Sequence, residues 1–133
     1  MKNSTPSDFP FIREKRHIYN KFVDREIGYV EMGWAKFSIE LHSDLHQDDQ
    51  KVDGVCCWDE RAIKLEMNLS DFDARETIIH EIYHCMLEGV GLDEKNFDQQ
   101  RMFMSNEQLV VALSKQTMLI HKFNPKLFAT IYA

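Results

Sequence analysis

Two histidines four residues apart are the residues of this sequence best suited to chemistry. His80 and His84 enclose Glu81 in the run His-Glu-Ile-Tyr-His. On a helix, four residues make a little over one turn, so both imidazoles would project from one face and bind one zinc ion. Glu81 would lie about 100° around the helix from His80, where a carboxylate takes a proton from a metal-bound water. The spacing predicts a Zn²⁺ site with His80 and His84 as ligands and Glu81 as general base.

A catalytic zinc ion usually has three protein ligands and one water molecule, so a third ligand is needed. Glu107 is the best-placed candidate, because it would open a later helix on the same face as Val110, Val111 and Met118. That face could pack against the histidine-bearing helix, and an acidic residue on an apolar packing face needs a partner. The alternative for Glu107 is a surface charge favoured by the helix dipole.

Other downstream residues are weaker candidates for the third ligand. Glu88 lies one turn beyond His84, where three successive ligands would require a strongly bent helix. His121 would lie roughly 20 Å further along the second helix than Glu107. The acidic residues between the two helices remain possible, namely Asp93, Glu94 and Asp98.

The residues around the motif predict the helix that would present it. Asp73 followed by Glu76 is typical of a helix start, and Gly89 ends the periodic pattern after Glu88. Apolar side chains, with Tyr83 among them, occupy most of the helix circumference, and the motif forms a narrow polar strip. We expect a helix that is buried on nearly all sides and whose polar strip is satisfied by a metal.

The rest of the chain predicts a small sheet and further helices, which is an α+β fold. Residues 34–42 alternate between apolar and polar, as in a half-buried strand, and residues 55–58 and 62–69 form an expected hairpin. Residues 43–53 have no periodicity and indicate a surface loop. A second helix is expected from Ser105 to Phe123, ended by Asn124-Pro125, with a short helix over 127–132. Residues 9–25 fit either a helix or a short strand.

Size and charge narrow the class of protein. The chain has 133 residues, of which 44% are apolar, which suits a single domain over residues 9–133 behind a disordered tail of residues 1–8. The net charge of −6, with scattered basic residues, argues against nucleic-acid binding. No apolar run approaches the roughly 20 residues that span a bilayer. We expect a soluble cytoplasmic protein with no membrane partner.

The three cysteines do not form a typical disulfide framework. Cys56 and Cys57 are adjacent and Cys85 is the third, whereas secreted scaffolds usually carry an even, spread set. We therefore expect reduced thiols. A metal cluster of the three cysteines is a weaker alternative, because the usual two-residue gap between thiols is missing.

The motif resembles that of the zincin metallopeptidases, in the glutamate-ligand branch that includes thermolysin. This branch pairs the HExxH motif with a later Asn-Glu at a helix start, and Asn106-Glu107 matches it. Residues 54–84 are also similar to small zincin-like proteins encoded by bacteriophages. The resemblance implies a minimal zincin-like domain, with a small mixed sheet packed on the motif helix and on a second, glutamate-bearing helix. The chain would then be a gluzincin-like phage protein in the host cytoplasm.

The resemblance also implies roles for individual residues. His80, His84 and Glu107 would be the zinc ligands of a hydrolase that cleaves peptide or protein substrates, with Glu81 as general base. The strand at residues 54–58 would be the sheet edge along which an extended peptide pairs. Two features depart from related patterns: Val111 stands where the thermolysin pattern has an aspartate, and Leu87 and Val90 stand where the metzincin extension has glycine and histidine.

Two rival functions remain open. The chain could be a non-catalytic zinc-binding module of the zincin fold that binds a partner protein, for example as a phage regulator. A fourth protein ligand closing the zinc site would support that reading. A metal-free interaction protein is the second rival, and stoichiometric zinc would exclude it.

Overall fold

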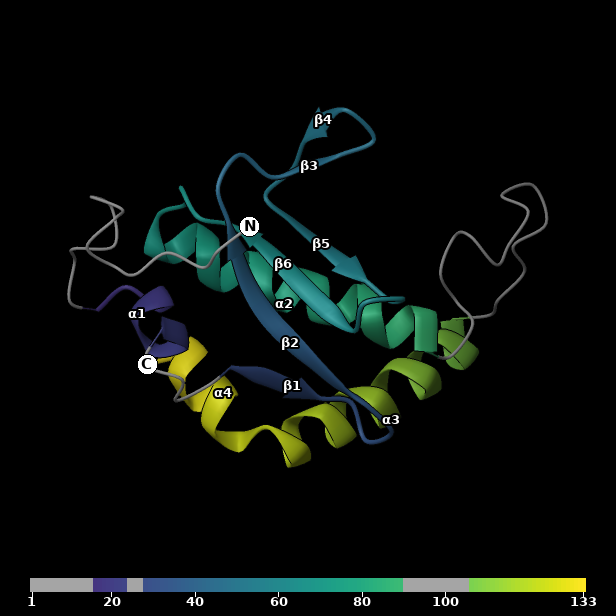
Figure 1. Ribbon diagram of the computed structural model, residues 1–133. Helices are drawn as coiled ribbons and strands as arrows, with labels where there is room; N and C mark the ends of the chain where they lie inside the picture. Colours follow the sequence, from purple (N-terminus) through teal and green to yellow (C-terminus); the bar gives the residue numbers. More distant parts are fainter. Residues whose placement is uncertain (1–15, 24–27, 90–105) are drawn as a thin grey trace.

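A four-stranded mixed sheet lies at the centre of the structure (Figure 1), a computed structural model that describes residues 16–23, 28–89 and 106–133. The strand order is β1-β2-β6-β5, with β2 and β6 parallel and the two outer pairs antiparallel. The α+β fold with a small mixed sheet is therefore confirmed. The expected tail of residues 1–8 lies outside the described residues. The strands are β1 (Tyr29–Glu31), β2 (Lys36–His42), β5 (Gly54–Cys57) and β6 (Ala62–Glu66).

Alternation of side chains places these strands as predicted. In β2 the apolar residues Phe37, Ile39 and Leu41 are buried while the residues between them are partly exposed. Strand β6 is buried at four of its five positions, because β2 and β5 flank it and a helix covers one face. Its pairing with β5 confirms the predicted hairpin, although β6 ends at Glu66, earlier than the alternation suggests.

The segment expected to be an irregular loop contains a second, very small hairpin. Strand β3 (His46–Gln47) pairs with β4 (Gln50–Lys51) in an antiparallel arrangement. The two residues between them, Asp48 and Asp49, have φ angles of 53° and 64°. A two-residue turn with positive φ at both positions matches the twist of the strands that it joins. The sequence shows no period here because both faces of this hairpin are exposed.

Four helices accompany the sheet, and none in the described parts is long and apolar enough to cross a membrane. The predicted cap of the motif helix, Asp73, is wrong by three residues. The hydroxyl of Ser70 accepts a hydrogen bond from the backbone N–H of Asp73 at 3.1 Å, so Ser70 is the cap. The helices are α1 (Tyr19–Val23), α2 (Asp71–Gly89), α3 (Asn106–Phe123) and α4 (Pro125–Ile131).

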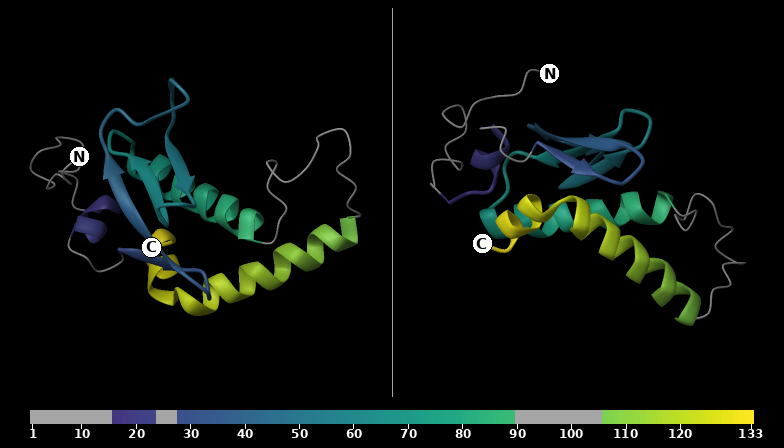
Figure 2. Two further views of the ribbon diagram at one scale, coloured as in Figure 1. Left: turned by 45° about the vertical axis from the view of Figure 1, so that its right-hand side comes forward. Right: turned by 90° about the horizontal axis from the view of Figure 1, so that it is seen from below.

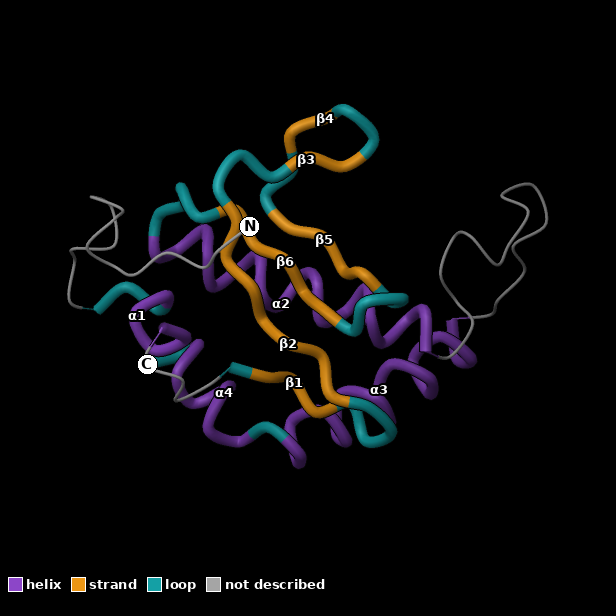
Figure 3. Tube along the Cα trace, in the orientation of Figure 1, coloured by secondary structure: helices purple, strands orange, loops and turns teal. Residues whose placement is uncertain are grey.

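Helices α2, α3 and α4 lie on one face of the sheet, as the tube in Figure 3 and the views in Figure 2 show. Helix α2 contacts β5 and β6 along its length, whereas α3 reaches β1 through its C-terminal end. The apolar face expected to pack α3 against α2 is exposed: Val110, Val111 and Met118 are 55%, 42% and 74% exposed. That packing prediction is wrong, because the N-terminal half of α3, which carries Val110 and Val111, extends beyond the sheet, and Met118 lies on an exposed side of the helix.

The pairing of the cysteines also differs from expectation. Cys56 on β5 and Cys85 on α2 form a disulfide, with their Cα atoms 6.3 Å apart, and Cys57 is free. The expectation of three reduced thiols is wrong, because the fold brings together two residues that are 29 positions apart in the sequence. The same pairing excludes a metal cluster of the three cysteines in this structure.

Asn124 ties the junction of α3 and α4 to strand β1. Its side-chain oxygen accepts the N–H of Glu31 at 2.7 Å, and its amide nitrogen donates to the carbonyls of Glu31 and Ile120 at 2.7 and 2.8 Å. The side chain is buried, so water cannot replace these bonds when they are lost.

We expect Asn124→Ala to lower the free energy of unfolding by about 2 kcal/mol or more, because it leaves part-buried backbone groups of β1 without partners. Urea unfolding followed by circular dichroism would measure the change. The matched control is Asn68→Ala, at an exposed side chain, for which the expected change is within about 0.5 kcal/mol. Equal effects of the two substitutions would contradict the role of Asn124.

Candidate metal centre

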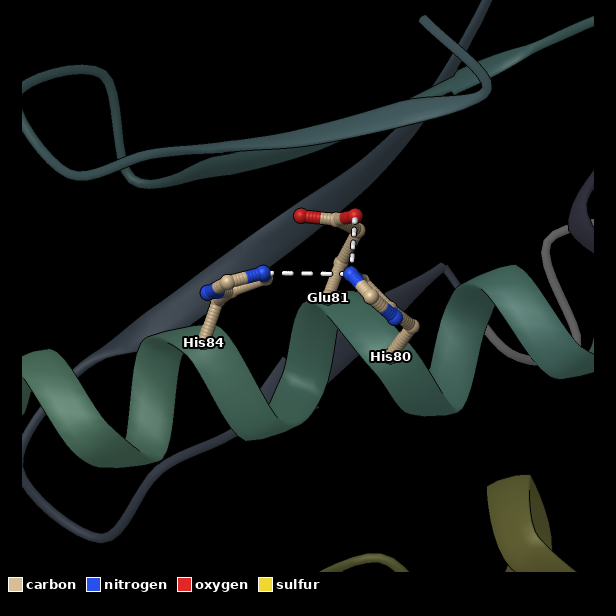
Figure 4. Close-up of side chains that lie close together, drawn as sticks. All are labelled: His80, Glu81 and His84. Carbon is tan, nitrogen blue, oxygen red and sulfur yellow. Dashed lines mark hydrogen bonds and ion pairs between the residues drawn. The ribbon is translucent and has the colours of Figure 1, made fainter. Parts of the chain in front are cut away.

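The two motif histidines project together from the exposed side of α2. Their Nε2 atoms are 3.1 Å apart, and the ring centroids are 4.8 Å apart. Figure 4 shows the two imidazoles facing each other on either side of Glu81. The helical spacing predicted this arrangement. Tyr83, which the helical wheel placed on the buried side, is 38% exposed instead, because the sheet covers less of the helix circumference than expected.

Glu81 projects from the same side of the helix, with its carboxylate between the two imidazoles and nearest the strands (Figure 4), and it is only 6% exposed. One carboxylate oxygen lies 3.9 Å from Nε2 of His80. Burial raises the pKa of Glu81, while His84, His80 and a hydrogen bond from the backbone N–H of Cys56 act in the opposite direction. The site therefore combines two imidazoles that solvent can reach with a carboxylate held in a largely water-free position.

Strand β5 makes this burial possible by passing very close to α2. A Cβ atom added to Gly54 would lie 2.7 Å from Cγ2 of Thr77 and 3.0 Å from Cγ of Glu81. No side chain larger than hydrogen fits there without displacement of α2 or β5. The sequence reasoning singled out neither Gly54 nor Thr77. A glycine inside an apolar strand is a signal of close backbone approach that would have pointed to this position.

The donor atoms fit a zinc ion. One ligand atom from each of His80, Glu81 and His84 lies within 4.8 Å of the others. Two imidazole nitrogens bound to one tetrahedral zinc would stand roughly 3.3 Å apart, from Zn–N bonds of about 2.0–2.1 Å. The observed Nε2–Nε2 distance of 3.1 Å is close to this value. Neutral imidazole nitrogen is also a preferred ligand of zinc.

The structure brings together three of the four predicted site residues. Glu107 lies in the first turn of α3, is exposed, and is not part of the His80, Glu81 and His84 group. Its role as third ligand stays a prediction. The candidates Asp93, Glu94 and Asp98 lie outside the described residues. His121 stacks on Phe128 with ring centroids 3.9 Å apart, as expected for a histidine with a packing role.

We expect Gly54→Ala to lower the free energy of unfolding by about 1–3 kcal/mol, because the added methyl group overlaps Thr77 and presses on Glu81. Thr77→Ser removes the overlapping Cγ2 methyl, so the double variant should regain part of the loss. Urea unfolding would measure both changes.

Gly28→Ala is the matched control, since a Cβ there would meet nothing within 4 Å. Its expected change in unfolding free energy is within about 0.5 kcal/mol or stabilising. If Gly54→Ala behaved like Gly28→Ala, the close approach of β5 to Glu81 would be refuted.

No protein-family model, curated protein or solved structure matches this chain. A function is therefore argued from the geometry of His80, Glu81 and His84 and from the strand that covers them.

Proposed function

We propose that this protein is a zinc-dependent metallopeptidase, with His80 and His84 as zinc ligands and Glu81 as general base. One observation carries the proposal: two exposed imidazoles face each other across 3.1 Å, and a buried carboxylate from the same helix turn lies 3.9 Å from one of them. This combination suits hydrolysis better than storage of a metal, because the carboxylate stands beside the ligand pair where a water would be activated.

Each residue has a defined task in this mechanism. Zinc, when bound, would lower the pKa of a water molecule and polarise the peptide carbonyl. Glu81 takes a proton from the attacking water and later gives it to the leaving amine, so the proton count balances. Burial raises the pKa of Glu81, which makes its carboxylate a stronger base than an exposed glutamate. His80 and His84 hold the metal at a constant place relative to Glu81, because all three side chains come from α2.

The substrate would be an extended peptide. Among the described residues, strand β5 is an outer strand of the sheet and pairs with β6 alone, so its other edge could pair with a peptide. Main-chain pairing gives little side-chain specificity, so a range of peptide sequences would bind.

The exposure of the ligands favours catalysis over a structural zinc module. A structural site needs four protein ligands that close it. Within residues 16–23, 28–89 and 106–133, the group contains two histidines and Glu81 and no further ligand. Both imidazoles are open to solvent, as a water-bearing catalytic site requires.

The cytoplasm is the proposed location, in line with the sequence. Disulfides in reducing compartments are usually transient, catalytic or redox-sensing. A cytoplasmic location would make the Cys56–Cys85 disulfide a bond that forms and breaks, and a secreted location would make it permanent.

We expect the purified protein to hold one zinc ion after dialysis against a weak chelator, and His84→Ala to lose it. Glu81→Gln should keep the zinc but lower peptide hydrolysis by about 10²–10⁴-fold, because the amide accepts no proton from water. Elemental analysis and cleavage of an unstructured protein substrate would measure the two effects. Full turnover by Glu81→Gln would refute its role as base.

We expect Glu107→Ala to lose zinc affinity by about tenfold or more if Glu107 is the third ligand. Competition with a chromophoric chelator would measure the affinity. Glu76→Ala, at an exposed acidic residue of α2, is the matched control and should bind zinc like wild type. Unchanged affinity in Glu107→Ala would move the third ligand to Asp93, Glu94 or Asp98.

A further inference from the structure

The disulfide joins β5 to α2 directly beside the proposed general base. Cys85 follows His84 in the sequence and lies one helical turn beyond Glu81. Cys85 is fully buried, and its bond to Cys56 places its sulfur against strand β5 of the sheet. On the strand, Cys56 stands two residues after Gly54, where an added Cβ atom would overlap Thr77 of α2. The covalent link therefore falls within one turn of the contacts that bury Glu81.

Cys56 also reaches Glu81 through its backbone. Its N–H acts to lower the pKa of the Glu81 carboxyl, against the larger effect of burial. The opposite strand position is Ile63 on β6, and in the part of the chain that the structure describes β5 has no strand on its outer side. An edge strand with one neighbour frays more readily than a central strand. The disulfide is the covalent constraint that holds this edge, and with it the N–H of Cys56, against α2.

We propose that Cys56 and Cys85 are positioning residues of the metal centre, and that reduction of their disulfide releases β5 from Glu81 and lowers activity. The proposal deepens the proposed function and rests on Glu81 as its general base. The positional claim itself concerns only the close approach of β5 to Glu81, which the geometry at Gly54 shows. His80 and His84 share one helix and do not depend on β5, so reduction should leave zinc binding intact.

The reductant would be a dithiol. One of its thiolates attacks a sulfur of the Cys56–Cys85 bond and forms a mixed disulfide, and its second thiol resolves this intermediate. The dithiol leaves as its own disulfide, and Cys56 and Cys85 together gain two electrons and two protons as two thiols. Reoxidation by a disulfide reagent reverses every step.

The test compares local and global loosening of the sheet. Amide hydrogen exchange is measured by nuclear magnetic resonance in the Cys57→Ser background, which contains only the Cys56–Cys85 pair. We compare the oxidised protein, the dithiothreitol-reduced protein and Cys85→Ala. Alkylation and mass measurement confirm the thiol state. Cys57→Ser against wild type is the matched control for loss of a cysteine, and both should exchange alike when oxidised.

The expected result is that the Cys56 amide exchanges about tenfold faster or more after reduction and in Cys85→Ala, while the Leu65 amide on the inner strand β6 does not. Turnover should fall by about tenfold or more with zinc content unchanged, and reoxidation should restore both. If Cys85→Ala does not fold, the dithiothreitol-reduced protein is compared with the oxidised protein instead.

Three outcomes would overturn the proposal. Unchanged exchange at Cys56 in fully reduced protein would show that the disulfide does not hold this contact. Equal acceleration at Cys56 and Leu65 would make the disulfide a general stabiliser with no positioning role. If exchange at Cys56 became faster while turnover stayed unchanged, the contact of β5 with Glu81 would not be needed for catalysis. A protein that hydrolyses no peptide in any form would refute the proposed function instead, and the exchange rate of Cys56 would still decide the positional claim.

Discussion

The close approach of β5 to α2 at Gly54 is the contact on which the site depends. Only a hydrogen atom fits between the strand and the side chains of Thr77 and Glu81. This proximity removes Glu81 from water, and the backbone N–H of Cys56 acts to lower the pKa of its carboxyl. A buried carboxylate without such a donor would be costly, so the strand both buries the charge and partly stabilises it.

Neighbouring residues of α2 perform different tasks because their side chains differ in exposure to solvent. His80 and His84 face solvent, where a metal and a water molecule have access. Glu81 faces the sheet, where its protonation is set by burial, by the imidazoles and by Cys56. Residues that are neighbours in the sequence thus receive opposite environments, because successive positions on a helix differ by about 100°.

The disulfide bonds β5, an edge strand of the sheet, covalently to α2, whereas the backbone hydrogen bonds of β5 join it to β6. Elsewhere in the structure, side-chain hydrogen bonds join segments that are far apart in the sequence. Asn124 links α4 to β1, and Arg75 of α2 donates to the carbonyls of Thr130 and Ile131 at the end of α4 at 2.6 and 2.7 Å. A cation at that helix end also interacts favourably with the helix dipole.

The sequence by itself determined the features that depend on local periodicity. The spacing of His80 and His84 placed both on one helix face, and the alternation of Phe37, Ile39 and Leu41 identified β2. Asn124-Pro125 ended α3 where predicted, because proline disfavours the helical conformation in the residue before it.

Only the tertiary structure decided which distant segments meet. The parallel pairing of β2 with β6, the contact of Gly54 with Thr77 and the Cys56–Cys85 link all join residues far apart in the chain. The apolar side chains of α3 illustrate the limit: their pattern predicted a buried face, and Met118 is 74% exposed. The physical reason is that periodicity shows which side of an element is apolar, whereas the partner that covers it is chosen by the packing of the whole chain.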